Sequence, residues 1–305
     1  MKRNKKFYLI YPTALLLAGA LLMQGCGQKD PNAKEPGDST ATNEHTYIYE
    51  NMNYSYKTDE SAFLSDILTG MSQDYLLLVN KNHPLINAYN PASSSYILES
   101  MVTLDRQVTK NGMELEARTA RALYAMLAEM AADGVTDIQI TSAYRDETYQ
   151  SGTYAYWWGQ EMLRISEDAE SYYKKKYAGT DYDYLWENYR SKGLTSLNEA
   201  DAKEVANFYS ALPGQSEHHT GLCIDFRTST AGLTRAFENT DAFRWLSENC
   251  YRFGFILRYP EEKEDITGYF YEPWHYRLVG REAATEIMLG HLTLEEFLGI
   301  NETYF

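Results

Sequence analysis

The chain has 305 residues, of which 44% are hydrophobic, 14% aromatic and 23% charged, so it can bury one full-sized core and is neither a disordered nor a fibrous protein. Its formal net charge of −15 at pH 7 would repel phosphate backbones, so nucleic-acid binding is not expected. The three cysteines, Cys26, Cys223 and Cys250, are too few for a disulfide-stapled scaffold of this length, and the core must supply most of the stability.

The N-terminus combines positive charge with an apolar run. Four basic residues within the first six precede the run, which is shorter than the roughly 20 residues that span a bilayer and leads directly to Cys26. This arrangement resembles a bacterial lipoprotein signal, in which the cysteine is lipidated and becomes the new N-terminus. Such signals usually carry Leu and a small residue where this chain has Met23 and Gln24. We predict a signal peptide at residues 1–25, and the alternatives are an ordinary secretory signal or an uncleaved anchor.

Two segments separate the signal from the folded domain. After the cysteine, residues 26–45 contain no Val, Ile, Leu, Phe, Trp or Tyr and are dense in Gly, Pro, Asp and Asn, which predicts a disordered tether. Residues 46–72 form an N-terminal extension in which a short periodic stretch around Phe63 predicts a brief helix. The domain itself is expected over residues 73–305.

The domain alternates helical and strand patterns. An amphipathic helix is predicted where Leu123, Met126, Leu127 and Met130 recur at helical spacing ahead of Gly134. In chain order, the patterns predict a strand at 75–80, a helix at 114–132, a strand at 137–142, a helix at 198–210, a strand at 221–226, a helix at 241–249, strands at 253–258 and 274–279, and a helix after Gly280. This mixture favours an α+β fold, with a small antiparallel sheet and flanking helices.

Residues 216–225 (SEHHTGLCID) combine a histidine and a carboxylate at a spacing suited to a metal site. Gly221 permits a sharp turn before the predicted strand. The strand can therefore carry Asp225 back toward His218, which brings together one imidazole and one carboxylate.

Residues 272–277 (EPWHYR) add a second histidine and a second acid. Pro273 pushes Glu272 out of the α region, which excludes the helical HExxH geometry. Positions i and i+3 of a regular strand face opposite sides. Glu272 and His275 therefore share a pocket only if the step through Pro273 and Trp274 turns or bulges, and we predict that it does.

The two stretches together predict an open divalent-metal site. The imidazoles of His218 and His275 and the carboxylate of Asp225 suit a metal of borderline softness such as Zn²⁺, and they leave a fourth position for water. Glu272 is then placed to take a proton from that water. For either stretch alone, the alternative is that the histidines are core or surface residues and the acids belong to a solvated face.

At these residues the chain resembles the VanY-type D-alanyl-D-alanine carboxypeptidases, zinc metallopeptidases that trim the stem peptides of bacterial peptidoglycan. The resemblance runs in blocks from about Tyr75 to Gly290. The family's S-x-H-x-x-G-x-A-x-D block matches residues 216–225, its E-P-W-H-x-R block matches 272–277, its S-x-Y-R block with a following Gln matches 142–150, and residues 254–260 (GFILRYP) are similar to family sequence. The resemblance implies that zinc is bound by His218, Asp225 and His275, that Glu272 is the catalytic base, and that Arg145, Gln150, Ser216, Tyr259 and Trp274 line the substrate pocket.

The role implied for Arg145 agrees with its chemistry. A carboxypeptidase must recognise a free terminal carboxylate, and a guanidinium can hold one through two parallel hydrogen bonds. In a very acidic protein, a cation in the cleft also offsets the repulsion of an anionic substrate. The alternative is a surface salt bridge to Asp146 or Glu147.

The chain departs from the family pattern in three places. Cys223 stands where Ala is usual, and because the family's ligand set is already complete, a small buried side chain is favoured over a further soft ligand. The sequence leaves open whether Cys223 and Cys250 form a disulfide. Residues 151–210 form an insertion with nine tyrosines and three tryptophans, for which a helical subdomain packed by its aromatics is favoured over a glycan- or peptide-stacking wall. Residues 46–70 have no counterpart.

The resemblance implies a zinc-dependent D,D-carboxypeptidase that removes the C-terminal D-alanine from peptidoglycan stem peptides, with Glu272 as general base. L,D-carboxypeptidase action on tetrapeptide stems, dipeptidase action and endopeptidase action share the same motifs. A non-catalytic wall-binding or solute-binding lipoprotein is the alternative from another class, and the survival of all ligands and the base favours the enzyme. We expect an extracytoplasmic monomer anchored to the membrane through lipid on Cys26.

Overall fold

The computed structural model describes residues 56–58, 73–85, 101–104, 112–162 and 199–304, which all belong to one compact unit, residues 44–305. The predicted signal peptide, the tether with Cys26, the brief helix around Phe63 and the middle of the insertion lie outside the described residues. Within the described ranges, no helix combines the length and hydropathy needed to cross a membrane.

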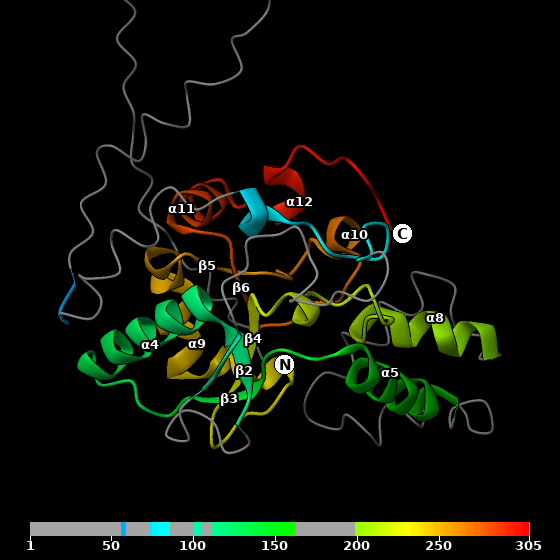
Figure 1. Ribbon diagram of the computed structural model, residues 1–305, viewed down its shortest axis with the longest axis horizontal. Coiled ribbons are helices and arrows are strands. Elements are labelled where there is room, and N and C mark those ends of the chain that lie inside the picture. The colour runs from blue at the N-terminus through cyan, green and yellow to red at the C-terminus, as the bar shows by residue number, and fades with distance from the viewer. Residues whose placement is uncertain (1–55, 59–72, 86–100, 105–111, 163–198, 305) are drawn as a thin grey trace, which may run out of the picture. The chain divides into compact units, whose positions relative to one another are not determined.

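A four-stranded antiparallel sheet forms the centre of the described chain. It contains β3 (Gln139–Ser142), β4 (Cys223–Arg227), β5 (Phe255–Leu257) and β6 (His275–Leu278) in the order β3-β4-β6-β5 (Figure 1). The register places Asp225 opposite both Ser142 and His275. The predicted α+β class and four of the predicted strands are confirmed, with each strand one to three residues shorter than its pattern.

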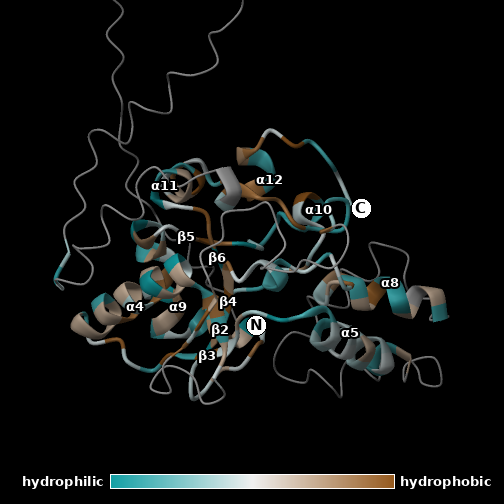
Figure 2. Ribbon diagram, viewed as in Figure 1, coloured by the Kyte–Doolittle hydropathy of each residue, from teal (hydrophilic) through white to brown (hydrophobic). Residues whose placement is uncertain are grey.

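The two faces of the sheet differ in chemistry because side chains alternate along each strand. On one face, Ile224, Phe226, Tyr276 and Leu278 are buried in the main core. The other face therefore presents the intervening residues, Cys223 and Asp225 of β4 and His275 and Arg277 of β6, all of them buried. In Figure 2 the central strands carry the brown hydrophobic colour among helices of mixed colour. One face of the sheet thus stabilises the fold, and the other displays ionisable groups.

Two helices supply much of the main core. The first is α4 (Ala117–Ala132), which contributes Leu123, Met126 and Met130, and the second is α9 (Asp241–Asn249), which contributes Trp245 and Leu246. The bounds predicted for α9 are confirmed. The helix predicted from residue 114 begins at Ala117 instead, because Glu114–Glu116 form β2, which pairs with β1 (Met101–Thr103). The Glu116 carboxylate then caps the helix by accepting from the Thr119 N–H at 2.9 Å.

A second apolar cluster packs under the other end of the sheet. It joins Leu78 and Ile256 to residues of α11 (Arg281–Gly290) and α12 (Leu294–Phe297). The helix predicted after Gly280 is therefore confirmed. The remaining short helical turns are η1 (Gln73–Leu76), η3 (Glu217–Thr220), η4 (Arg235–Asn239), η5 (Cys250–Phe253) and α10 (Glu264–Thr267).

The prediction of a strand at residues 75–80 is wrong. The run is buried at Tyr75 and Val79, as its apolar character requires, but it forms η1 followed by irregular chain. The Arg277 guanidinium donates hydrogen bonds to the carbonyl oxygens of Tyr75 and Leu77, at 3.2 and 2.8 Å. A side chain, and not a neighbouring strand, therefore donates the hydrogen bonds that these two carbonyl groups accept.

The described ends of the insertion are helical. The chain enters it along α5 (Glu147–Met162) and leaves it along α8 (Glu199–Tyr209), and these helices lie side by side (Figure 1). The rings of Trp157 and Tyr209 meet edge to face, with their centroids 5.1 Å apart. The helix predicted at 198–210 is confirmed, and aromatic packing joins the two helices, while residues 163–198 lie outside the described part.

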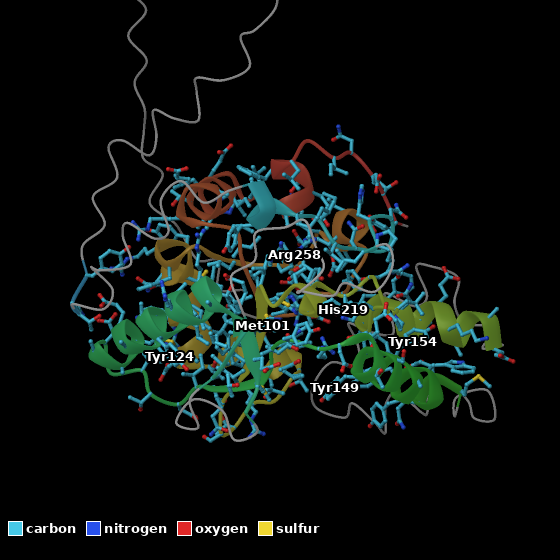
Figure 3. All side chains as sticks on the ribbon, viewed as in Figure 1. Met101, Tyr124, Tyr149, Tyr154, His219 and Arg258 are labelled. Atoms are coloured by element: carbon cyan, nitrogen blue, oxygen red, sulfur yellow. The ribbon has the colours of Figure 1, made fainter. Side chains whose placement is uncertain are left out.

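Substitution of Gly221 tests the steric requirement of the turn that precedes β4. Its φ is +69°, and an added Cβ would lie 3.0 Å from the Glu116 nitrogen and from the end of Met101, which Figure 3 labels. Gly134 has φ +85° but open space around it. A left-handed backbone costs an L-residue about 1–2 kcal/mol, so Gly134→Ala should lower the free energy of unfolding by that amount and Gly221→Ala by more. Urea unfolding of both variants measures the difference, and equal losses would contradict the steric argument.

Candidate active site and metal centre

His218 is held by a tight turn between α8 and β4. Ser216 precedes η3, and its hydroxyl accepts from the His218 N–H at 3.3 Å. The turn ends at Gly221, whose left-handed backbone starts the approach to β4. The sharp turn predicted at this glycine is confirmed, and it leaves the His218 side chain only 2% exposed.

Asp225 lies between the two predicted imidazoles. Its Oδ2 is 3.2 Å from His218 Nε2, and its Oδ1 is 3.0 Å from His275 Nδ1. Burial alone would raise the pKa of Asp225, but the two histidines hold it well below its usual range. The three residues predicted as ligands are therefore adjacent and buried.

The orientation of His218 suits metal binding. Its Nδ1 lies 2.6 Å from the Ala143 carbonyl oxygen, which can only accept, so Nδ1 donates. In the neutral ring, Nε2 then turns a lone pair toward the Asp225 carboxylate, and it makes no hydrogen bond. Two electron-rich atoms in contact require a proton or a metal ion between them. The donor chemistry of this site therefore fits a divalent metal.

The neighbouring His219 points elsewhere. Its Nδ1 lies 2.7 Å from the Arg145 carbonyl oxygen, and its Nε2 accepts from the Gly214 N–H at 3.1 Å. Both ring nitrogens are thus used to join the η3 turn to neighbouring loops. Of the two adjacent histidines, only His218 faces Asp225.

Glu272 reaches His275 through the predicted turn. The His275 N–H donates to the Glu272 carbonyl at 3.1 Å, closing a tight turn over Pro273 and Trp274 just before β6. Glu272 Oε2 is consequently 3.6 Å from His275 Nδ1. Burial, together with the nearby Asp225 carboxylate, raises the pKa of Glu272 to about 8. The ionised form of such a carboxyl group is a stronger base than an exposed carboxylate.

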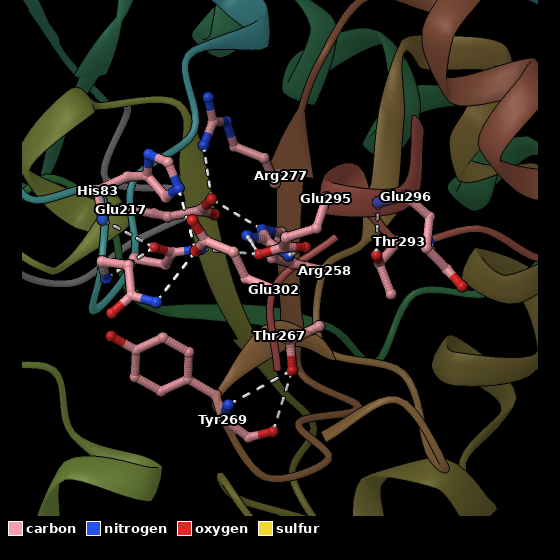
Figure 4. Close-up of polar contacts among 12 residues, drawn as sticks. His83, Glu217, Arg258, Thr267, Tyr269, Arg277, Thr293, Glu295, Glu296 and Glu302 are labelled. Atoms are coloured by element: carbon pink, nitrogen blue, oxygen red, sulfur yellow. Dashed lines mark hydrogen bonds and ion pairs between the residues drawn. The ribbon is translucent and has the colours of Figure 1, made fainter. Parts of the chain in front are cut away.

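A buried charge network supports the far side of His275. The Glu217 carboxylate lies 3.6 Å from His275 Nε2 and 2.7 Å from both Arg258 Nε and Arg277 Nη1. Arg258 in turn donates two hydrogen bonds to Glu295, at 2.9 and 2.7 Å (Figure 4). Burial alone would raise the pKa of Glu217, but the guanidinium groups of Arg258 and Arg277 hold it well below its usual range.

This network explains the orientation of His275. With a metal ion bound beside Asp225, Nδ1 would supply the lone pair, and the Glu217 carboxylate would stabilise the proton on Nε2. From the sequence, Glu217 is only the alternative to Glu272 as general base, and Arg258 and Glu295 are not predicted as site residues. The sequence shows that these segments contain charged residues. It does not show that the charged side chains are buried beside one another.

The residues predicted to line the substrate pocket surround one cavity of about 360 Å³ that also includes the metal-site residues. All five predicted lining residues contribute to it, namely Arg145, Gln150, Ser216, Tyr259 and Trp274. The helices α5 and α8 add Tyr149, Trp157 and Tyr209 to the lining, and the last two belong to the insertion. The two described ends of the insertion therefore meet through aromatic side chains and also border the candidate site.

Arg145 is placed as the predicted clamp. Within the described residues, no ion pair joins it to Asp146 or Glu147, and its Nε is buried without a hydrogen-bond partner. Asp146 instead accepts from the Tyr149 N–H at the start of α5. The guanidinium lines the cavity beside Gln150, whose amide donates to the Ala211 carbonyl at 2.7 Å. The salt-bridge alternative for Arg145 is not observed.

The two cysteines within the described residues are not paired with each other. Cys223 and Cys250 are both buried free thiols, so the disulfide considered from the sequence is absent. Cys223 lies on the polar face of the sheet, two residues before Asp225.

Comparisons with known proteins agree with this geometry. The family model described as VanY, D-alanyl-D-alanine carboxypeptidase, matches residues 112–281. A D-alanyl-D-alanine carboxypeptidase of Enterococcus faecalis is 34% identical over 264 residues, which cover 86% of this chain and 78% of that protein. The chain belongs to the VanY family. It is thus a carboxypeptidase-type hydrolase, and the membership explains why both motifs meet at one cavity.

Two solved structures of a VanY from a VanB-type resistance cassette have the same fold. One was determined with D-alanine-D-alanine, matches with a TM-score of 0.53 and 32% identity, and covers 75% of this chain and 99% of its own. The other, a variant of the D,D-pentapeptidase in complex with Zn(II), matches with a TM-score of 0.52 and 32% identity over 74% of this chain and 99% of its own.

The orienting role of the buried charge network can be tested at Glu217. Glu217→Gln should weaken zinc binding by about 10- to 100-fold, because an amide that donates toward Nε2 would leave the proton of His275 on Nδ1. Zinc affinity is measured by competition with a chromophoric chelator, and the tautomer of His275 by ¹⁵N NMR of the metal-free protein.

Glu295→Gln is the matched control for this prediction. It removes a carboxylate from the same Arg258 but does not touch His275. Both variants should lose folding stability, since each leaves a buried guanidinium short of a partner. Only Glu217→Gln should change the tautomer and the zinc affinity, and equal losses of affinity would contradict the orienting role.

Proposed function

We propose that this protein is a zinc-dependent D,D-carboxypeptidase that removes the C-terminal D-alanine from peptidoglycan stem peptides. The observation that carries the proposal is the arrangement within one cavity of His218, Asp225 and His275, a separate acid at Glu272 and a cation at Arg145. D-alanine-D-alanine bound to a VanY of the same fold supports the D,D specificity.

The metal-site residues would hold zinc through His218 Nε2, the Asp225 carboxylate and His275 Nδ1. Bound zinc would polarise the scissile carbonyl and make a water molecule more acidic. The Glu272 carboxylate accepts a proton from the attacking water and delivers it to the nitrogen of the departing D-alanine. The products are the shortened peptide and free D-alanine, and no covalent intermediate is formed.

The other cavity residues recognise the substrate. The Arg145 guanidinium is suited to the terminal carboxylate that a carboxypeptidase substrate presents. Gln150 and Ser216 offer polar groups beside it, and Tyr259 and Trp274 offer apolar faces. The ring of Tyr259 lies against His275, with centroids 4.8 Å apart, so it borders the reacting centre directly.

Glu272→Gln should retain zinc and lose turnover. The amide keeps the size of the side chain and can hydrogen-bond to water, but it cannot accept a proton, which typically costs about 10²–10⁴ in rate. His275→Ala should lose metal and activity together, and Arg145→Ala should retain zinc and raise KM. Metal content and the cleavage kinetics of penta- and tetrapeptide stems, with products weighed by mass spectrometry, measure all three variants.

The outcomes of these measurements separate the parts of the proposal. Near wild-type cleavage by Glu272→Gln would show that another group is the base. Preferred cleavage of tetrapeptide stems would replace the D,D assignment with L,D specificity. Full activity of metal-free wild-type protein would refute the dependence on zinc.

We also propose that the enzyme acts outside the cytoplasm as a monomer anchored through lipid on Cys26. The basic N-terminus, the apolar run and the tether support this placement, because together they would hold the domain near the wall. The wild-type protein expressed in a bacterial host should partition into detergent, and Cys26→Ser should shift to the aqueous phase. A Cys26→Ser protein that is still lipidated would contradict the proposal.

A further inference from the structure

The helix α5 exposes two tyrosines on one face. Tyr149 is 65% exposed and Tyr156 is 59% exposed, which makes them the two most exposed large hydrophobic side chains in the described part of the chain. They are two helical turns apart, about 10.5 Å along the axis, so both rings lie on the same side of the helix. Tyr154 differs, because its hydroxyl donates to the Lys203 carbonyl of α8 at 3.1 Å, and it lies between the two helices in Figure 3. Large apolar side chains gathered on an exposed face indicate a contact surface.

A shallow groove lies between these two tyrosines. Its lining consists of Thr148, Tyr149, Gly152, Thr153 and Tyr156. A Cβ added to Gly152 would meet no described atom within 4 Å, so the glycine keeps the floor of the groove open and no packing contact requires it. Glycine in the interior of a helix is destabilising relative to alanine, and the fold gives no reason for that cost here.

The groove is continuous with the cavity of the proposed active site. Tyr149 and Thr153 line both of them. The ring of Tyr156 meets Trp157 edge to face, with centroids 5.2 Å apart, and Trp157 in turn lines the cavity. A molecule bound in the cavity can therefore extend over the exposed face of α5 without leaving the protein surface.

The lining of the groove suits an uncharged ligand that carries hydroxyl groups. None of its five residues is ionised at neutral pH, although the chain has a net charge of −15. The Thr153 hydroxyl donates to the Tyr149 carbonyl at 3.1 Å, and its oxygen can still accept a hydrogen bond. The flat rings of tyrosines pack against the C–H faces of sugar rings, while their hydroxyls bond to the polar rims. An ionised peptide segment would find no opposite charge in this groove.

We propose that this groove binds the sugar backbone of peptidoglycan, a strand of neutral N-acetylated sugars. The inference rests on the proposed function, because that function brings a stem peptide, and with it the attached glycan, to the adjacent cavity. Tyr149 and Tyr156 stack on sugar rings of the strand while the stem occupies the cavity. The enzyme then prefers stems that are still attached to glycan over free stem peptides. Of the two roles considered for the aromatics of the insertion, packing thus applies to Trp157 and stacking to Tyr156.

Glycan strands freed of their stem peptides by an amidase test the groove directly. The full-length wild-type protein should bind them in isothermal titration calorimetry. Tyr156→Ala removes one stacking ring, and Gly152→Ala places a methyl group on the floor of the groove. Each substitution should lower the affinity for the strands by about 3- to 10-fold.

Two further substitutions are matched controls. Tyr124 is an exposed tyrosine of α4, and Gly159 is a second glycine of α5 around which the structure describes open space, and neither lines the groove. Tyr124→Ala and Gly159→Ala should leave the affinity for glycan unchanged. In urea unfolding, Gly152→Ala should be at least as stable as the wild-type protein, as should Gly159→Ala, so weaker binding by Gly152→Ala would not reflect a loss of folding. Equal losses of affinity in Gly152→Ala and Gly159→Ala would overturn the placement of the groove.

Kinetics distinguish this inference from the proposed function. Tyr156→Ala should lower kcat/KM for stems attached to glycan strands by a larger factor than kcat/KM for free stem peptides, and equal losses would overturn the glycan assignment. A wild-type protein that cleaves stem peptides but binds no glycan would overturn the inference and leave the proposed function intact. Glycan binding that depends on Tyr156, in a protein that cleaves no stem peptide, would support the groove and refute the proposed enzyme.

Discussion

The contact between the Asp225 carboxylate and two imidazoles is the interaction on which the rest of this structure depends. It places a charge and two ring nitrogens on a buried face of a four-stranded sheet, where a polar group without a partner is costly. The antiparallel register creates the contact, because it sets Asp225 of β4 opposite His275 of β6. The turn at Gly221 supplies the third member by returning His218 to the same face.

The charges behind this contact constrain the fold as well as the site. Glu217, Arg258, Arg277 and Glu295 are almost completely buried, and each makes ion pairs or hydrogen bonds to another member. Removing one partner of such a network leaves an uncompensated charge and typically costs about 3–5 kcal/mol, whereas the intact network contributes little net stability. The network contributes to the site by orienting His275. It connects the metal-site histidine to α12 and to the segment after η1, so distant parts of the chain hold one imidazole in place.

The cavity combines parts of different origin. The sheet and the η3 turn supply the metal-site residues, the segment between β3 and α5 supplies Arg145, and the start of α5 supplies Gln150. The insertion supplies an aromatic wall. The metal-site residues thus lie on paired strands and a tight turn, while the aromatic wall of the cavity comes from the helices at the two ends of the insertion.

Much of the site could be predicted from the sequence because its chemistry is local. The turn residue Gly221, the barrier to helix at Pro273 and the alternation of β4 are properties of short segments, so His218, Asp225, Glu272 and His275 could be identified from their spacing and from the family motifs. Regular helices such as α9 were equally accessible, since their apolar spacing and their caps lie within the segment.

Only the tertiary structure could decide where buried charges and irregular backbone lie. The run at residues 75–80 has the composition of a strand, but Arg277, about 200 residues away, satisfies its carbonyl groups in place of a neighbouring strand. The role of Glu217 and the surroundings of Cys223 likewise depend on which side chains the sheet register brings opposite them. A sequence pattern records the preferences of its own segment, whereas the partner of a buried polar group is chosen by the packing of the whole chain.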